Sequence, residues 1–114
     1  MNWVATRLKY LASVPIVNGL GEAARMDDES WPRYIRTTDF EGPRSLREAT
    51  RATLPPETAR LADVHQGDVL MSAAGTVGKT YLHVSDESAC FAGYLVRFRP
   101  RRGVDPRFIS YWTQ

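Results

Sequence analysis

Short runs of alternating apolar and polar residues recur along this chain and predict β-strands rather than long helices. The segment at residues 33–40, RYIRTTDF, is rich in β-branched and aromatic side chains and predicts a strand. A mostly apolar run at 68–73 predicts a buried strand, and 78–84 predicts a second strand after a tight turn. Together the last two segments predict a β-hairpin.

A further strand is predicted near the C-terminal end of the chain, at residues 90–100. Its alternation sets Tyr94, Val96 and Phe98 on one face, and Pro100 ends it. We expect Tyr94 and Phe98 to lie in the core, and Cys90 to be a small buried apolar residue.

Helical character is limited to three short segments. One is predicted around Ser45–Arg51 and a second at about Glu57–Leu61, with a proline pair between them. The third would begin with Asp105 as N-cap and Pro106 at the first helical position, and its apolar face is unfinished at Gln114. The pattern therefore predicts a single α+β domain: a twisted, mainly antiparallel β-sheet with short peripheral helices and an incomplete C-terminal helix.

Composition is that of an ordinary globular domain. The 114 residues are 43% hydrophobic and 25% charged, which is enough apolar material for a core. A single cysteine excludes an internal disulfide, and two histidines without clustered ligands argue against a metal centre. No apolar run approaches the roughly 20 residues that span a bilayer. We expect a cytoplasmic protein without a membrane partner or a cofactor.

The distribution of charge along the chain is more informative than the net charge. The net charge is only +2, but 13 of the 15 basic residues are arginine, the side chain suited to phosphates and guanine edges. The arginines gather in two clusters, at residues 33–51 and 97–102. Solvated arginines on strand and loop surfaces are the alternative explanation.

The stretch at residues 73–80, AAGTVGKT, is spaced like a phosphate-binding P-loop whose first glycine is alanine. A P-loop requires a helix directly after the loop, so that its N-terminus faces the phosphates. The residues that follow, TYLHV, alternate as a strand instead. Nucleotide hydrolysis is therefore disfavoured, and a hairpin turn flanked by glycines is the better interpretation.

Read in order, several segments resemble the target recognition domain of the DNA-specificity (S) subunit of type I restriction–modification enzymes. The resemblance lies in the ordered set RLKYLAS, GLGE, YIRTTDF, GDVLMSAAGTVGKTYL, AGYLVRFRP and DPRFISYW, which covers nearly the whole chain. It implies a non-catalytic module that reads double-stranded DNA. The partners it implies are methyltransferase (modification) subunits and nuclease/translocase subunits.

One recognition domain is present, so residues 1–114 are expected to be a partial module that lacks the family's C-terminal strands and long conserved helix. An alternative therefore stays open: a truncated relative that self-associates as a homodimer, or pairs with restriction–modification subunits, without reading DNA. Exposed apolar residues on the unfinished helix would favour such pairing.

Candidate DNA-binding residues follow from the charge pattern and the resemblance, and each has a structural alternative. Arg36 is a candidate groove contact, and its structural alternative is a surface ion pair with Glu41. Thr37 and Thr38 could contact bases or phosphates. The structural alternative for this strand end is that Asp39 caps a turn. The remaining candidates are basic: Arg44, Arg47 and Arg51 on one face of a helix, or a helix surface balanced by Glu48, and Lys79 as a phosphate contact or a solvated lysine. Residues 72, 75, 76 and 78 are interpreted as structural turn residues, and His65 and His83 as ordinary loop and strand histidines.

Overall fold

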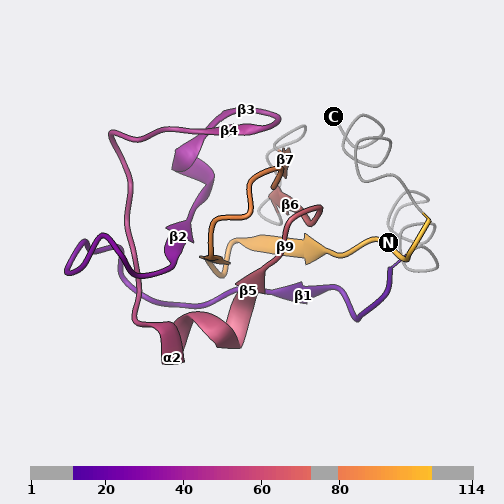
Figure 1. Cartoon of the computed structure of the whole chain (residues 1–114), viewed down its shortest axis with the longest axis horizontal. Helices are drawn as coiled ribbons and strands as arrows, with labels where there is room; N and C mark the ends of the chain where they lie inside the picture. The colour runs from indigo at the N-terminus through magenta and orange to yellow at the C-terminus, as the bar shows by residue number, and fades with distance from the viewer. Residues whose placement is uncertain (1–11, 73–79, 104–114) are drawn as a thin grey trace.

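The computed structural model describes residues 12–72 and 80–103 of the chain (Figure 1). Most of its strands are short, and the helical segments are single turns. In chain order the elements are β1 (Val17–Asn18), β2 (Arg33–Ile35), the 3₁₀ turn η1 (Thr37–Asp39), β3 (Phe40–Gly42), β4 (Ser45–Leu46), α2 (Pro56–Ala59), the 3₁₀ turn η2 (Arg60–Ala62), β5 (Asp63–Val64), β6 (Val69–Ser72), β7 (Thr80–Leu82), β8 (Ala89–Phe91) and β9 (Leu95–Phe98).

The described strands form three small sheets. One has four strands in the order β1-β9-β6-β7, a second has three in the order β2-β8-β5, and β3 pairs with β4. All pairings are antiparallel except β2 with β8, which is parallel. The predicted α+β class with mainly antiparallel strands is confirmed, although the strands are divided among three sheets.

The predicted hairpin is confirmed in its paired strands. Strands β6 and β7 pair antiparallel, with Val69 opposite Leu82 and Met71 opposite Thr80. The run before β6 turns at Gly67, whose φ of 95° lies in the left-handed region that glycine adopts without steric cost. Turn residues 75, 76 and 78 and the predicted C-terminal helix lie outside the described residues.

One hydrophobic cluster joins the three sheets. Its largest members come from strands of each sheet, and burying them together holds the sheets against one another. The buried members are Ile35, Phe40, Ala62, Val64, Leu70, Tyr81, Ala89, Phe91 and Leu95. Phe98 and Cys90 are also fully buried, as predicted. The short helix α2 lies on the opposite side of the molecule from the β3–β4 hairpin (Figure 1).

The predictions for residues 45–51 and for Tyr94 are wrong. Residues 45–51 do not form a helix: Ser45–Leu46 is strand β4, and bends and turns follow it. The turn at Pro43–Arg44 folds this segment back onto β3, where Leu46 pairs with Phe40 and packs on the core. Tyr94 is not in the core either, because a turn at Gly93–Tyr94 interrupts the predicted strand and leaves Tyr94 74% exposed.

Candidate nucleic-acid interface

The turn after β2 is organised by the buried carboxylate of Asp39. Strand β2 ends at Ile35, and the expected strand-terminal residues Thr37, Thr38 and Asp39 form η1 instead. The Asp39 carboxylate accepts a hydrogen bond from the backbone N–H of Arg36 at 2.8 Å and one from the Thr50 hydroxyl. The interpretation of Asp39 as a turn cap is therefore confirmed.

Arg36 bonds to the same carboxylate. Its Nη2 lies 3.1 Å from Asp39 Oδ1 and its Nε lies 3.3 Å from Oδ2, and Nη2 also donates to the backbone carbonyl of Thr50. The ion-pair partner is thus Asp39 and not the expected Glu41. Two of the three guanidinium nitrogens of Arg36 help to hold the turn.

The β3–β4 hairpin carries two exposed arginines. Arg44 lies in its turn and Arg47 directly follows β4, and neither side chain forms an ion pair with another described residue. The backbone of Arg47 is fixed, since its N–H donates to the Asp39 carbonyl at 2.8 Å and its carbonyl accepts from Arg33. This hairpin therefore presents two positive charges to solvent from a well-held backbone.

Arg51 differs from the other two candidates in its cluster. Its Nη2 lies 2.9 Å from Glu87 Oε2, and its Nη1 lies 3.6 Å from Glu48 Oε2. The hydrogen bond to Glu87 raises the pKa of the Arg51 guanidinium. The shared helix face expected for Arg44, Arg47 and Arg51 does not exist, because no helix forms there.

The β3–β4 hairpin lies against the hairpin of β6 and β7. The N–H of Leu82 donates to the carbonyl of Pro43 at 2.7 Å, and the rings of Phe40 and Tyr81 stack with centroids 5.7 Å apart. Residues 40–43 and 81–82, separated in sequence, thus meet in space. Lys79 lies outside the described residues, so its predicted phosphate contact stays a prediction.

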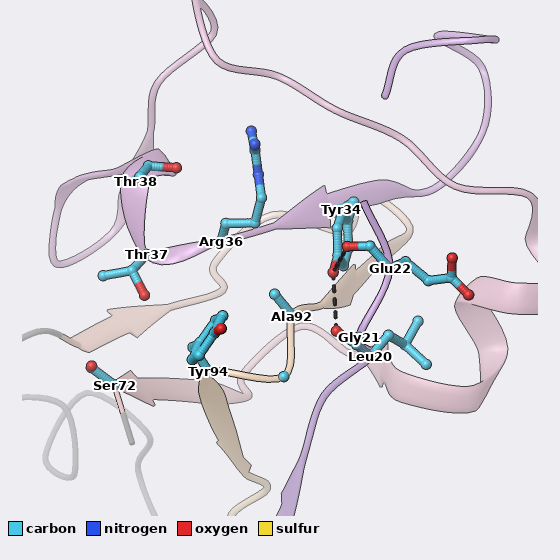
Figure 2. Close-up of a pocket in the computed structure, with 11 residues that line it drawn as sticks. Leu20, Gly21, Glu22, Tyr34, Arg36, Thr37, Thr38, Ser72, Ala92 and Tyr94 are labelled. Atoms are coloured by element: carbon cyan, nitrogen blue, oxygen red, sulfur yellow. Dashed lines mark hydrogen bonds between the residues drawn. The ribbon is translucent and has the colours of Figure 1, made fainter. Parts of the chain in front are cut away.

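A hollow of about 720 Å³ opens beside η1 (Figure 2). Its lining comes from η1, from the strap of chain at residues 20–22, from the end of β6 and from the turn between β8 and β9. The lining residues are Leu20, Gly21, Glu22, Tyr34, Arg36, Thr37, Thr38, Ser72, Ala92, Gly93 and Tyr94. Three of the predicted site residues, Arg36, Thr37 and Thr38, are therefore brought together, whereas Arg44, Arg47 and Arg51 are not part of the lining.

Tyr94, Ser72 and Glu22 are lining residues that the sequence-based prediction of the site missed. The alternation around Tyr94 indicated a core residue, and the dipeptide Gly93–Tyr94 is the only sequence signal of the turn that exposes it. Figure 2 shows the Thr37 side chain directed toward the side on which Tyr94 and Ser72 lie, and the Arg36 side chain extending away from Tyr94.

The strap at 20–22 is held tightly in place. The Tyr34 hydroxyl lies 3.0 Å from the Leu20 carbonyl oxygen and 2.7 Å from that of Glu22. The Leu20 N–H donates to Phe91 at 2.9 Å, and the Leu20 carbonyl accepts from Gly93 at 2.7 Å. These bonds fix one wall of the hollow relative to the turn that carries Tyr94.

The second arginine cluster is partly structural. Arg97 is buried and donates to the carboxylate of Asp63 at 3.0 Å, while Arg99 makes a two-point contact with the buried Asp68 at 2.9 and 2.8 Å. The bond to Asp68 raises the pKa of Arg99. Arg101 and Arg102 remain exposed. Two of these four arginines therefore serve the fold.

Neither histidine lies in this interface. His83 is buried: its Nε2 lies 2.9 Å from the carbonyl oxygen of Glu87, which can only accept, so Nε2 donates this bond, and Nδ1 lies 2.8 Å from the Tyr81 hydroxyl. His65 is exposed and contacts Asp63. Within residues 12–72 and 80–103, no group of three potential metal ligands occurs. In the same part of the chain, no helix has the length and apolar character needed to cross a membrane.

Comparison with known proteins gives structural matches and no sequence matches. No protein-family model matches the sequence, and no curated protein matches it. The fold is similar to a chain in a structure of a type I R-M system, solved to explain complex assembly and conformational transition, with a TM-score of 0.68 and 18% identity over 93% of this chain and 25% of that chain. It is also similar to the HsdS subunit from Thermoanaerobacter tengcongensis, with a TM-score of 0.62 and 18% identity over 96% of this chain and 32% of that one.

The chain thus spans a quarter to a third of the length of these two structures. At 18% identity these matches show a similarity of fold, and this similarity extends over nearly all of this chain. The resemblance to the target recognition domain of a type I specificity subunit, drawn from ordered sequence segments, is confirmed as a similarity of fold.

Proposed function

We propose that this chain recognises double-stranded DNA sequence-specifically, as part of the specificity function of a type I restriction–modification system. The observation that carries the proposal is the similarity of fold, with a TM-score of 0.68 over 93% of the chain, to a chain of a type I R-M system. In this role the module is non-catalytic and acts in the cytoplasm. It directs methyltransferase and nuclease/translocase subunits to their target.

The exposed arginines of the β3–β4 hairpin support this function. Arg44 and Arg47 have no carboxylate partner among the described residues, so a DNA phosphate can take that place without displacing an ion pair. Arg51 is already paired with Glu48 and Glu87, so a phosphate contact there would compete with existing bonds. We therefore propose Arg44 and Arg47 as the principal phosphate contacts, with Lys79 as a further one.

Arg36, Thr37 and Thr38 belong to the same proposed interface. The bonds of Arg36 to Asp39 and Thr50 give it a positioning role in addition to the proposed groove contact. Its Nη1 forms no hydrogen bond with another described residue and remains the nitrogen with which it would contact DNA. Thr37 and Thr38 lie at the hollow, where their hydroxyls can donate or accept.

Fluorescence anisotropy with labelled duplex DNA tests the proposal. We expect binding at low salt that weakens steeply as salt rises, because each neutralised phosphate releases condensed counterions. The full chain is titrated at two salt concentrations. Absence of duplex binding at low salt would contradict the proposal.

The alternative is an interaction protein that pairs with itself or with a restriction–modification subunit without reading DNA. It is favoured by β1, which among the described strands lies at an edge of the four-stranded sheet, with Ile16 37% and Val17 38% exposed. An exposed edge strand offers unpaired backbone groups to another chain. Light scattering separates the two functions: a monomer that binds duplex DNA argues for recognition, and a stable dimer without DNA binding argues for the alternative.

A further inference from the structure

The hollow beside η1 differs in chemistry from the arginine-bearing hairpin next to it. Arg36 is the one cation among its described lining residues, and Asp39 and Thr50 engage its guanidinium. Its side chain extends away from Tyr94 in Figure 2. Figure 2 shows the Glu22 side chain extending away from Tyr94 and Thr37 as well. The hollow is therefore poorly suited to the DNA backbone.

Its polar groups suit the edge of a base instead. The hydroxyls of Thr37, Thr38, Ser72 and Tyr94 can each donate or accept a hydrogen bond. Base edges in the major groove present donors and acceptors in a pattern that identifies each base pair. Leu20 and Ala92 also line the hollow, but both pack on the hydrophobic core.

Tyr94 is the lining residue most available to DNA. It is 74% exposed at the turn between β8 and β9. This turn is well held: the Gly93 N–H donates to Leu20 at 2.7 Å, the Leu95 N–H donates to Ala92 at 3.0 Å, and Asn18 donates to the Gly93 carbonyl at 3.2 Å. A large aromatic side chain on a fixed turn can meet a base with little loss of backbone entropy.

These observations indicate that the hollow and the β3–β4 hairpin have different roles in DNA binding, an inference that rests on the proposed function. We infer that the hollow reads base edges and that Tyr94 is its principal specificity-determining residue. Thr37 contributes a hydroxyl, and Arg44 and Arg47 hold phosphates without reading sequence. The chemical class recognised in the hollow is thus a base edge of duplex DNA and not a phosphate.

A selection experiment tests this separation. The full chain and its variants are each used to select from duplex DNA randomised at its centre, and salt dependence is measured on the duplex that the wild-type chain selects. We expect Tyr94→Ala to lower discrimination at one or two base pairs by roughly tenfold, with the salt slope unchanged. Tyr94→Phe and Thr37→Val then separate the contribution of the ring from that of the hydroxyls.

Arg44→Ala is the matched variant, since it also truncates an exposed side chain. It should lower the salt slope by about 1 and leave the selected sequence unchanged. A wild-type chain that selects a sequence, together with Tyr94→Ala and Thr37→Val variants that select the same one equally well, overturns this inference and leaves the proposed function standing. A wild-type chain that binds no duplex, or selects no sequence, overturns the proposed function and the inference with it.

Discussion

The guanidinium of Arg36 donates two hydrogen bonds to the carboxylate of Asp39, with Nη2–Oδ1 at 3.1 Å and Nε–Oδ2 at 3.3 Å. Asp39 is completely buried, and Arg36 is the only residue whose side chain forms an ion pair with it among the described residues. The turn that presents Thr37 and Thr38 to the hollow therefore depends on this pair. Arg36 therefore both supports the turn and belongs to the candidate interface.

Replacing Arg36 with alanine should destabilise the fold markedly. The substitution leaves the buried Asp39 carboxylate without its cationic partner, and breaking such a pair costs about 3–5 kcal/mol. Because the Thr50 hydroxyl and the backbone N–H of Arg36 still bind the carboxylate, we expect the free energy of unfolding to fall by about 3 kcal/mol. Urea denaturation measures the free energy of unfolding.

Arg44→Ala is the control for that experiment. Arg44 is exposed and has no ion pair with a described residue, so its removal should change the free energy of unfolding by less than about 0.5 kcal/mol. Equal effects of the two substitutions would show that the Asp39 pair does not hold the turn.

Gly19→Ala should destabilise the strap that walls the hollow. A Cβ on Gly19 would lie 2.2 Å from the carbonyl oxygen of Phe91 and 2.4 Å from that of Ala92, so the backbone must shift to admit it. Overpacking of this kind costs typically about 1–3 kcal/mol.

Gly21→Ala, two residues further along, is its matched control. A Cβ there meets nothing within 4 Å, so we expect a change in the free energy of unfolding within about 0.5 kcal/mol. The difference between the two midpoints in thermal denaturation gives the result directly. Indistinguishable midpoints would mean that the strap does not pass as close to β8 as described.

Stability should fall in alkaline solution through two buried acids. Burial raises the pKa of the Cys90 thiol from 9.0 to about 12 and that of the Tyr81 phenol from 10.0 to about 12. Their unfolded-state groups ionise first, so the contribution is complete below pH about 9 and is lost as pH rises toward about 12. Between its unfolded-state and folded-state pKa values, each group lowers the free energy of unfolding by about 1.4 kcal/mol per pH unit.

Urea denaturation of the wild-type chain and of Cys90→Ala at several alkaline pH values measures this loss. Since Cys90 is the only cysteine, the variant should lose the part of the slope that begins near pH about 9 and keep the part that begins near about 10, where tyrosine ionises. Identical slopes for the two proteins would contradict the role assigned to the buried thiol.

Strands with a strong local pattern were predicted well from the sequence. The apolar run around Val69–Ser72 and its partner Thr80–Leu82 form the expected hairpin, and this excludes the helix that a nucleotide-binding P-loop needs after its strand. The helix near residues 57–61 also forms, as α2 and η2, because the proline pair before it supplies a favourable start. Local chemistry determines these elements.

Features set by contacts distant in sequence were missed. Ser45–Arg51 has helical propensity in isolation, but Leu46 gains more by pairing with Phe40 and packing on the core. The alternation of the sequence places Tyr94 at a core position. However, Leu20 hydrogen-bonds to Gly93 and stabilises a turn that exposes Tyr94. The hollow is therefore not visible in any single stretch of sequence.

The charge pattern alone could not separate functional arginines from structural ones. Arg33 and Arg97 are buried, and Arg99 contacts the buried Asp68, although in sequence they resemble the exposed Arg44 and Arg47. The carboxylates that pair with them lie about 15 to 34 residues away along the chain, at Glu48, Asp68 and Asp63. Pairing across such separations is determined by the fold.

The central claim, that this chain binds duplex DNA through the β3–β4 hairpin, is tested most directly by anisotropy titrations of the Arg44→Ala/Arg47→Ala double variant against Arg60→Ala. Arg60 is also exposed and begins η2, which directly follows α2 on the opposite side of the molecule from the hairpin (Figure 1). We predict that the wild-type chain and Arg60→Ala bind with the same affinity and salt slope, whereas the double variant binds more weakly with a slope smaller by about 2. Equal binding by all three proteins would contradict the claim.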